Sequence, residues 1–278
     1  MVHVVIMKCG NIATSTMVDL LLDEIAARDD LQVTVVGSGP KMTPAETTRI
    51  AGYIPSTNPD ILVVCGPNAA SPGMTRLREA LADVKAPKIV IGDGPSKKVK
   101  DKLEQEGFGY LIMEADPLIG ARREFLDPTE MAIFNADVIR VLATVGSLRT
   151  VQEELDKAIQ SVKNGKVYLP RLVVSESRSL AKAGFSNPYA RAKAAVAFRL
   201  ADLAAQVNYN ACFVEKDVKK YIRLAAAAHE AVRTAAQLAD EAREIEKASD
   251  KVLRTPHSRK GRILRKRALL AKPQEAVQ

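Results

Sequence analysis

The chain has 278 residues, of which 47% are hydrophobic and 27% charged, and its formal net charge is +8. These values exclude a disordered chain and fit one large domain or two small ones. No apolar run reaches the length of a membrane span, and the N-terminus lacks the features of a signal peptide. Three scattered cysteines without a CxxC spacing predict reduced thiols and a cytoplasmic protein.

The first 113 residues alternate short apolar runs with helical patterns. The runs "VHVVIM", "QVTVVG", "DILVVC", "PKIVIG" and "GYLIM" are rich in β-branched residues, which is typical of parallel strands covered on both faces. Helices are predicted between them, over residues 14–28, 43–53, 73–83 and 96–106. The second of these has Thr43 as its cap, Pro44 at the first position and Glu46 completing a capping box. Repeated strand–helix units predict an α/β fold, a doubly wound, mostly parallel, Rossmann-like sheet.

After residue 128 the sequence becomes rich in alanine, and long helices are predicted over residues 128–145, 147–164, 188–206 and 217–247. Only "LPRLVVS" and "VNYNACFVE" have the composition of strands, which we expect to form a small separate sheet. The chain is therefore predicted to comprise an α/β domain, residues 1–120, and a helical-bundle part with minor β structure, residues 121–278.

The positive charge lies mainly at the C-terminal end. From Arg254 to Gln278 there are eight Lys or Arg residues and one acidic residue, so this tail carries +7 of the total. A basic tail can bind polyphosphate, but aromatic residues make up only 4% and none interleave the basic ones. The stretch "RKGRILRKRALL" also has the spacing of a short helix. We predict a solvated or interface segment, and not a nucleic-acid site.

Ligands of open parallel sheets bind outside the carboxyl ends of the strands. The four turns that follow the first four strands are "KCGNIATS", "GSGPKMTP", "CGPNAASPG" and "GDGPSKK". Each alone has the composition that any strand-to-helix turn requires, but four on one edge indicate a binding cleft. Lys8 is either a cation beside this cleft or a lysine that reaches solvent from an edge position.

Familiar catalytic motifs are missing from the sequence. "GSGPKM" and "GDGPSK" have two of the three Rossmann glycines, which does not support a nicotinamide dinucleotide. The P-loop pattern and the GxSxG elbow are absent, and three scattered histidines form no metal-binding pattern.

One polar segment, "DPLIGARREFLDPTEMAIFNADV", joins the two predicted parts. Its arginines can clamp phosphate or carboxylate, and its acids can stabilise a cation. Alternatively, it is a salt-bridged hinge in which Asp127 caps the next helix. His257, in "VLRTPH", is either a ligand contact or a structural histidine.

Several of these stretches together resemble coenzyme F420-dependent methylenetetrahydromethanopterin dehydrogenase, an archaeal one-carbon enzyme. They are "IMKCGNIATS", "VVGSGPKMTP", "CGPNAASPG", "IGDGPSKKVKD", "GARREFLDPTEMAIFNADV", "NPYARAKA", "CFVEKD", "AHEAVRTAAQLADEARE" and "VLRTPH". The resemblance covers nearly the whole chain, in order. It implies hydride transfer between methylene-tetrahydromethanopterin and coenzyme F420, a homo-hexamer built as a trimer of dimers, and neither metal nor flavin. Strongly acidic members differ from this basic chain, which leaves the host's salt and temperature open.

The residues agree with what this reaction needs. Both ligands are long and anionic, and the methenyl product is a cation. We predict that the coenzyme contacts Lys8, Cys9, Gly10, Asn11, Thr14, Ser15, Gly37, Ser38, Gly66, Pro67, Asn68, Gly92 and Asp93. Predicted substrate contacts are Arg122, Arg123, Asp127 and His257, and the predicted catalytic acids are Glu124 and Asp137. The alternatives are another deazaflavin- or NAD(P)-linked oxidoreductase on the same scaffold and, less favoured, a non-enzymatic RNA-binding protein.

Overall fold

The computed structural model describes residues 1–275, apart from the side chain of Asp23. Its contacts divide the chain into two units. The first comprises residues 1–113, 151–173 and 257–262, and the second comprises residues 114–150, 174–256 and 263–278. The predicted linear boundary at residue 120 lies close to the first change of unit. Two later segments belong with the first unit all the same.

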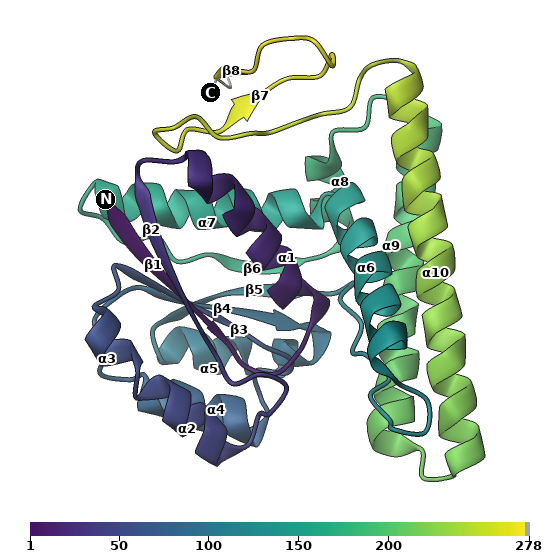
Figure 1. Cartoon of the computed structure of the whole chain (residues 1–278), viewed down its shortest axis with the longest axis horizontal. Helices are drawn as coiled ribbons and strands as arrows, with labels where there is room; N and C mark the ends of the chain where they lie inside the picture. Colours follow the sequence, from purple (N-terminus) through teal and green to yellow (C-terminus); the bar gives the residue numbers. More distant parts are fainter. Residues whose placement is uncertain (276–278) are drawn as a thin grey trace. The chain divides into compact units, whose positions relative to one another are not determined.

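A six-stranded sheet forms the centre of the first unit, with the strand order β2-β1-β3-β4-β5-β6 (Figure 1). The pairs β1–β2, β1–β3, β3–β4 and β4–β5 are all parallel. The strands are β1 Val2–Lys8, β2 Leu31–Gly37, β3 Ile61–Cys65, β4 Lys88–Asp93, β5 Phe108–Met113 and β6 Arg171–Val174. The five strands predicted before residue 113 are thereby confirmed.

Helices cover both faces of the sheet because alternate strand side chains point to opposite sides. On one face, Val4 and Ile6 of β1 meet α1 and α7. On the other, Val5 and Met7 share a core with α2, α3, α4 and α5. These elements are α1 Ala13–Asp23, the 3-10 turn η1 Glu24–Ala27, α2 Pro44–Ala51, α3 Ile54–Thr57, α4 Pro72–Ala80, the 3-10 turn η2 Gly94–Val99, α5 Lys100–Gln105 and α7 Ser147–Lys163.

The second unit is built around long helices. In Figure 1, α9 and α10 run side by side with α6 next to them, and α9 and α10 bury many small residues, such as Ala197, Ala201 and Ala228. Small side chains permit close helix packing. The elements of this unit are α6 Pro128–Thr144, α8 Glu176–Ala183, α9 Pro188–Tyr209, the π-helical turn η3 Asn210–Val214, α10 Val218–Ala248, β7 Leu264–Arg265 and β8 Gln274–Glu275.

Three predictions of the second half were wrong in part. "LPRLVVS" does contain a strand, β6, but it lies at the edge of the main sheet and not in a separate one. "VNYNACFVE" is not a strand, since it continues α9 into η3. The small extra sheet that does exist is the antiparallel pair β7–β8, in the tail that was predicted to be helical.

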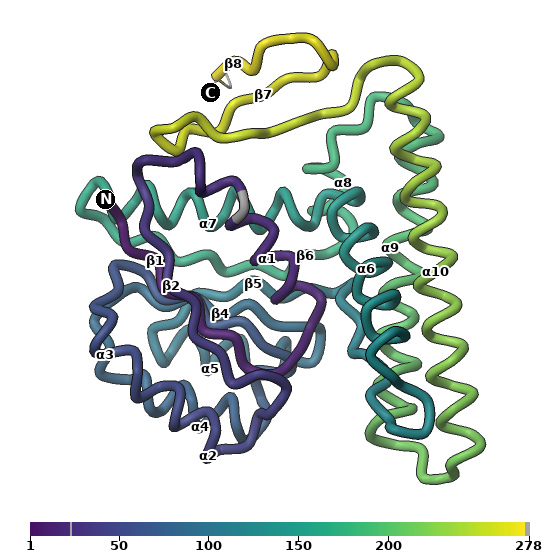
Figure 2. Tube along the Cα trace, viewed as in Figure 1, coloured from purple at the N-terminus to yellow at the C-terminus, as the bar shows by residue number. Residues whose placement is uncertain are grey.

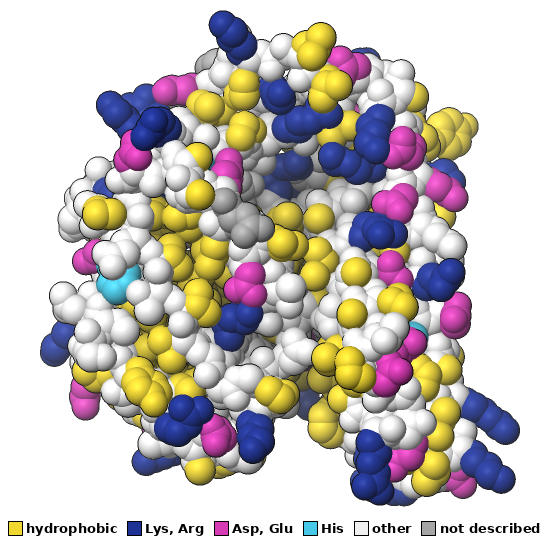
Figure 3. Space-filling model, viewed as in Figure 1, with side chains coloured by type: hydrophobic (Ala, Val, Ile, Leu, Met, Phe, Trp, Pro, Cys, Tyr) yellow, Lys and Arg dark blue, Asp and Glu magenta, His cyan; other side chains and the backbone are white. Residues whose placement is uncertain are grey.

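The parts of the basic tail that belong to the second unit are held by other residues of that unit. Arg254 and Lys266 form a backbone bridge, and the Arg267 guanidinium donates to the carbonyl oxygens of Gly184 and Lys251. Figure 3 shows Lys and Arg side chains gathered at the top of the view, where Figure 1 places the tail. Among the described residues no single helix is long and apolar enough to cross a membrane, although the bent pair α6 and α7 passes by length and composition.

Candidate functional site

The strand order creates a switch point between β1 and β3. The chain passes from β1 to β2 on one side and then returns to β3 on the other, so the turns after β1 and β3 diverge. Open parallel sheets bind ligands at such a point, outside the carboxyl ends of the strands. The turns "KCGN" and "GPNAA" therefore occupy the position where this fold holds its ligands.

The turn after β1 is built closely against its neighbours. The Cys9 amide donates to the Cys65 carbonyl at 2.8 Å, and the Gly10 amide donates to Gly39 at 3.1 Å. Gly10 has a φ of +73°, and a Cβ there would lie 2.3 Å from the Sδ of Met42, so only glycine fits. The Cys9 thiol is fully buried, and this burial raises its pKa to about 12. It is a neutral core group at physiological pH.

Lys8 reaches a partner that the sequence did not indicate. Its Nζ lies 2.5 Å from Oδ2 of Asp19 on α1, and its side chain remains 24% exposed. Neither sequence interpretation anticipated this ion pair. A half-buried cation whose charge is shared with one carboxylate can still attract an anionic ligand.

The turn after β3 approaches the first turn closely. A Cβ at Gly66 would lie 2.4 Å from the Cys9 carbonyl oxygen, so this approach requires glycine. Asn68 adopts a left-handed φ of 42°, and its amide donates to the Asp93 carboxylate at 2.7 Å. The adjacent amide of Ala69 donates to the Ser96 hydroxyl at 2.9 Å. The end of β4 therefore supports the turn after β3.

The structure brings the predicted coenzyme residues together at one edge of the sheet. Gly37 ends β2 beside Lys8, and the Ser38 amide donates to the Lys8 carbonyl at 3.0 Å. Gly92 and Asp93 end β4 beside the turn after β3. Thr14 and Ser15 lie in the first turn of α1 and are buried, and the Ser15 hydroxyl donates to the Ile12 carbonyl at 2.8 Å. Pro67 is buried and Asn11 half-buried in the two central turns.

Within the second unit, Arg122 is committed to structure. Its Nη2 donates to the Cys212 carbonyl at 2.6 Å, and its guanidinium lies 4.8 Å from the centre of the Tyr221 ring. Its Nε is buried without a hydrogen-bond partner among the described residues. Arg123, by contrast, is 92% exposed and pairs with Glu124 at 3.0 Å. The two neighbouring arginines thus have different roles.

The predicted acids also differ in their surroundings. Asp127 caps α6 by accepting from the Glu130 amide at 2.7 Å, as the hinge interpretation anticipated. A hydrogen bond from Arg123 lowers the pKa of Glu124, with further contributions from its own amide and from Tyr221. Burial raises the pKa of Asp137 against the opposing effect of Arg140, whose Nη1 lies 3.7 Å away. Glu124 is therefore the more firmly ionised of the two predicted catalytic acids.

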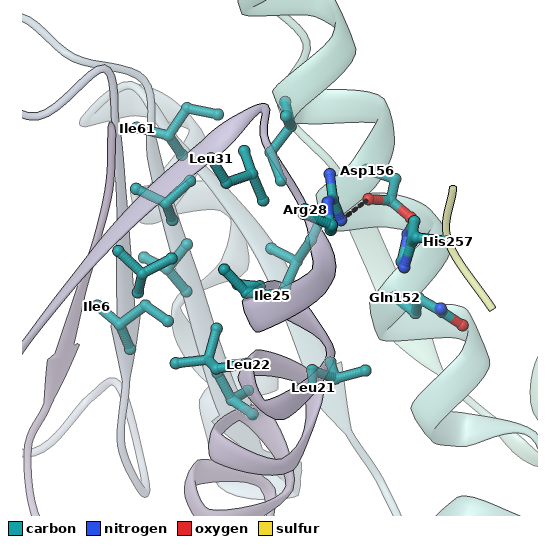
Figure 4. Close-up of a pocket in the computed structure, with 16 residues that line it drawn as sticks. Ile6, Leu21, Leu22, Ile25, Arg28, Leu31, Ile61, Gln152, Asp156 and His257 are labelled. Atoms are coloured by element: carbon teal, nitrogen blue, oxygen red, sulfur yellow. Dashed lines mark hydrogen bonds and ion pairs between the residues drawn. The ribbon is translucent and has the colours of Figure 1, made fainter. Parts of the chain in front are cut away.

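His257 lies in the first unit, against the face covered by α1 and α7 (Figure 4). Its Nδ1 lies 2.7 Å from Glu24 at the end of α1, and its Nε2 lies 2.6 Å from Asp156 on α7. Arg28, just before β2, also reaches Asp156, at 3.5 Å. This cluster adjoins an apolar cavity of about 60 Å³. It is at the opposite end of α1 from the turn after β1, so the geometry offers no support for a substrate contact of His257.

Sequence reasoning missed two buried side chains that hold the turn after β3. Ser96 lies in "GDGPSKK", where a hydroxyl residue carries no distinguishing signal because turns of this kind commonly contain one. Arg78 of α4 was not singled out in the sequence, yet it is only 2% exposed. No local pattern distinguishes a buried arginine from an exposed one when its partners are distant in sequence.

Comparison with known proteins identifies the family. A family model described as methylene-5,6,7,8-tetrahydromethanopterin dehydrogenase matches residues 2–274. The chain belongs to this family. The F420-dependent methylenetetrahydromethanopterin dehydrogenase of Methanocaldococcus jannaschii is 50% identical over 275 residues, covering 98% of this chain and 99% of that protein. The enzyme of the same name from Archaeoglobus fulgidus is 52% identical over 274 residues, with coverage of 98% and 99%.

A solved structure agrees with this assignment. It is an F420 dependent methylene-tetrahydromethanopterin dehydrogenase in complex with methylene-tetrahydromethanopterin and coenzyme F420. Its TM-score is 0.95 at 45% sequence identity, and the match covers 98% of this chain and 99% of that one. The resemblance recognised in the sequence is confirmed.

Proposed function

We propose that this chain catalyses reversible hydride transfer between methylene-tetrahydromethanopterin and coenzyme F420. The methylene carbon gives up a hydride to the deazaflavin ring, which also takes a proton from solvent. The products are the methenyl-tetrahydromethanopterin cation and the reduced coenzyme. The observation that carries the proposal is membership of the family over residues 2–274.

The coenzyme is proposed to lie across the carboxyl ends of β1, β3 and β4. Two features support this position: the switch point of the sheet, and glycines at residues 10 and 66 that allow neighbouring segments of the backbone to pack closely. Hydride transfer requires donor and acceptor carbons held in contact, so positioning supplies much of the rate. A rigid edge of tightly hydrogen-bonded turns suits that task.

Glu124 is the proposed stabiliser of the developing methenyl cation. Its carboxylate stays ionised because its pKa is lowered, first by the hydrogen bond from Arg123. Such a contact matters most in the transition state, where positive charge appears. Glu124→Gln should therefore lower kcat while leaving ligand binding intact. Asp137→Asn serves as the comparison, since its ion pair with Arg140 supports a structural role.

We further propose a cytoplasmic homo-hexamer. Tyr189, Val196 and Leu203 recur every seven residues on α9 and are 76%, 47% and 49% exposed. This spacing places them on one helix face. An exposed apolar stripe of this kind is typical of an interface between copies of a chain. Cys9 and Cys212 are free thiols, which supports a reducing compartment.

The deciding experiment is a spectrophotometric assay with purified protein. Methylene-tetrahydromethanopterin should discharge the absorbance of oxidised coenzyme F420, and the methenyl product should restore it from the reduced coenzyme. NAD and NADP in place of coenzyme F420 serve as controls and should give no turnover. Turnover with a nicotinamide coenzyme alone would establish the alternative oxidoreductase and refute the proposal.

A further inference from the structure

We propose that Arg78 and Ser96 are positioning residues for the coenzyme. They fix the loop of residues 66–70 in its binding conformation without touching the ligand. This inference rests on the proposed function, since it takes the edge at β3 to be the coenzyme site.

One residue of this loop has a left-handed backbone. Asn68 has a φ of 42°, a conformation that most residues avoid and that asparagine, like glycine, adopts more readily. Its own Oδ1 accepts from the Ala70 amide at 3.2 Å, and its amide is fixed by Asp93. The conformation of Asn68 is therefore held both from within the loop and by Asp93 at the end of β4.

Ala69 is held at both of its backbone groups. The Ser96 hydroxyl of η2 accepts from its amide at 2.9 Å, and Arg78 Nη1 of α4 donates to its carbonyl. Ala69 and Ser96 are completely buried, and Arg78 is 2% exposed. Two different elements therefore clamp one residue, at a depth where neither side chain is open to a ligand.

Burial of the Arg78 guanidinium is energetically unfavourable for a residue that only holds a turn. Its Nε donates to Glu106 at 2.7 Å, but its Nη2 is buried without a hydrogen-bond partner among the described residues. Burying a guanidinium with an unsatisfied donor is unfavourable. An ordinary surface turn requires no such group, so we attribute it to the need for a preformed loop.

The other end of the loop is fixed as well. The Gly66 amide donates to the Ile91 carbonyl at 3.0 Å. Gly66 also packs against the Cys9 carbonyl oxygen, in the turn after β1. With Ala69 clamped, Gly66, Pro67 and Asn68 are held between two anchors. A preformed loop loses little conformational entropy when the ligand binds, so the ligand binds more tightly.

The test compares Ser96→Ala, Arg78→Met and Arg78→Lys with the wild type. In Ser96→Ala and Arg78→Met the KM and Kd for coenzyme F420 should rise about tenfold, which is the effect of ordering about one backbone residue upon binding. The KM for the pterin and the kcat at saturating coenzyme should not change. Arg78→Lys should lie between, because its ammonium can still donate to the Ala69 carbonyl.

Arg28→Met is the matched control, since Arg28 is also a buried, ion-paired arginine but precedes β2 at the other end of the sheet. It should lower the melting temperature without changing the coenzyme Kd. Hydrogen exchange of a peptide spanning residues 64–74 should be faster in Ser96→Ala and slow again when coenzyme is added.

Two results would overturn the inference. One is an unchanged coenzyme Kd in folded Ser96→Ala and Arg78→Met variants. The other is an equal rise in Arg28→Met, which would trace the effect to general instability. Wild-type protein that binds coenzyme F420 but turns over no pterin would refute the proposed function instead, and the Kd comparison would still decide the roles of Arg78 and Ser96.

Discussion

Cys9 lies inside the proposed site and yet has the properties of a core residue. Because burial raises its pKa to about 12, it supplies no thiolate nucleophile at physiological pH. Cys9→Ala should keep most of the activity. Cys9→Ser should keep measurable activity but lose about 1–3 kcal/mol of stability, the cost of an unsatisfied buried hydroxyl. Kinetic assays and denaturant melts measure both. Abolished turnover in a folded, coenzyme-binding Cys9→Ala variant would contradict direct hydride transfer.

Lys8 offers a second test at the same scale. If its ammonium contacts the coenzyme, Lys8→Ala should raise the KM for coenzyme F420 roughly tenfold or more, since a charge-assisted contact contributes about 1.5–3 kcal/mol. The KM for the pterin should change little. Asp19→Asn is the matched control because it breaks the same ion pair and leaves the cation in place. If the two variants raise the KM equally, Lys8 acts only through its ion pair with Asp19 and does not contact the coenzyme.

Single residues were predictable where the signal is local. The Asp127 cap follows from an acidic residue directly before a proline and a helical pattern, and it is confirmed. The contact of Arg122 with the Cys212 carbonyl spans 90 positions, and the contact of Arg78 with Glu106 spans 28. Such pairs depend on the tertiary fold, so the sequence shows a charge without showing its partner.

At the scale of elements, the hydrophobic pattern predicted the strands before residue 113 correctly. It predicted the wrong secondary structure for segments whose tertiary packing overrides their composition. "VNYNACFVE" has strand-forming residues, yet Ala211 of η3 packs with Tyr221 and Ala225 of α10, and that contact favours a helical backbone. The tail has helical spacing, but its many like charges repel one another along a helix. Backbone pairing between residues 254 and 266 replaces the helix.

The segment of residues 257–262 is predicted to give a pH-dependent stability. Both ring nitrogens of His257 face carboxylates, and an ionised carboxylate only accepts hydrogen bonds, so this arrangement favours the imidazolium form of the ring. Burial and the nearby Arg28 lower its pKa, but Asp156 and Glu24 outweigh them and raise it above the ordinary value. The stabilisation is therefore complete below about pH 6.5 and is lost as the pH rises through the folded-state pKa.

The measurement is unfolding of His257→Gln and wild type across this range. At pH 6 the variant should be less stable by about 1.5–3 kcal/mol, the usual contribution of hydrogen bonds to charged groups. The difference should shrink as the medium becomes alkaline. His3→Gln is the control, because His3 pairs with the uncharged Thr34 hydroxyl. A difference that stays constant with pH would show that His257 is not charged in the folded protein.

At the scale of the whole molecule, the stripe on α9 leads to a prediction about assembly. Val196→Glu combined with Leu203→Glu places charges on the proposed interface and should reduce the mass measured by light scattering. Val167→Glu is the control, because Val167 is 68% exposed and lies in a loop outside the stripe. An unchanged mass in the double variant would remove α9 from the interface.

The division into two units was the part of the fold least accessible to sequence reasoning. Composition changes near residue 120, and that change suggests a single boundary. Returning segments are invisible to composition because α7 resembles the other helices, and residues 257–262 resemble the rest of the basic tail. Figure 2 shows this late segment returning beside residues 28–30, where the Asp29 amide donates to the Arg259 carbonyl at 2.9 Å.

This discontinuity has a consequence for biosynthesis. Strands β1 to β5 leave the ribosome first, while the helix that covers Val4 and Ile6, α7, emerges only after α6 has been made. During that interval α1 covers only part of that face of the nascent sheet, and partly folded chains with exposed apolar surface associate wrongly. The contacts of His257 with Glu24 and Asp156 form only after α10 has been made. The strands of the first unit are therefore made early, but that unit is completed only when residues 257–262 have been made.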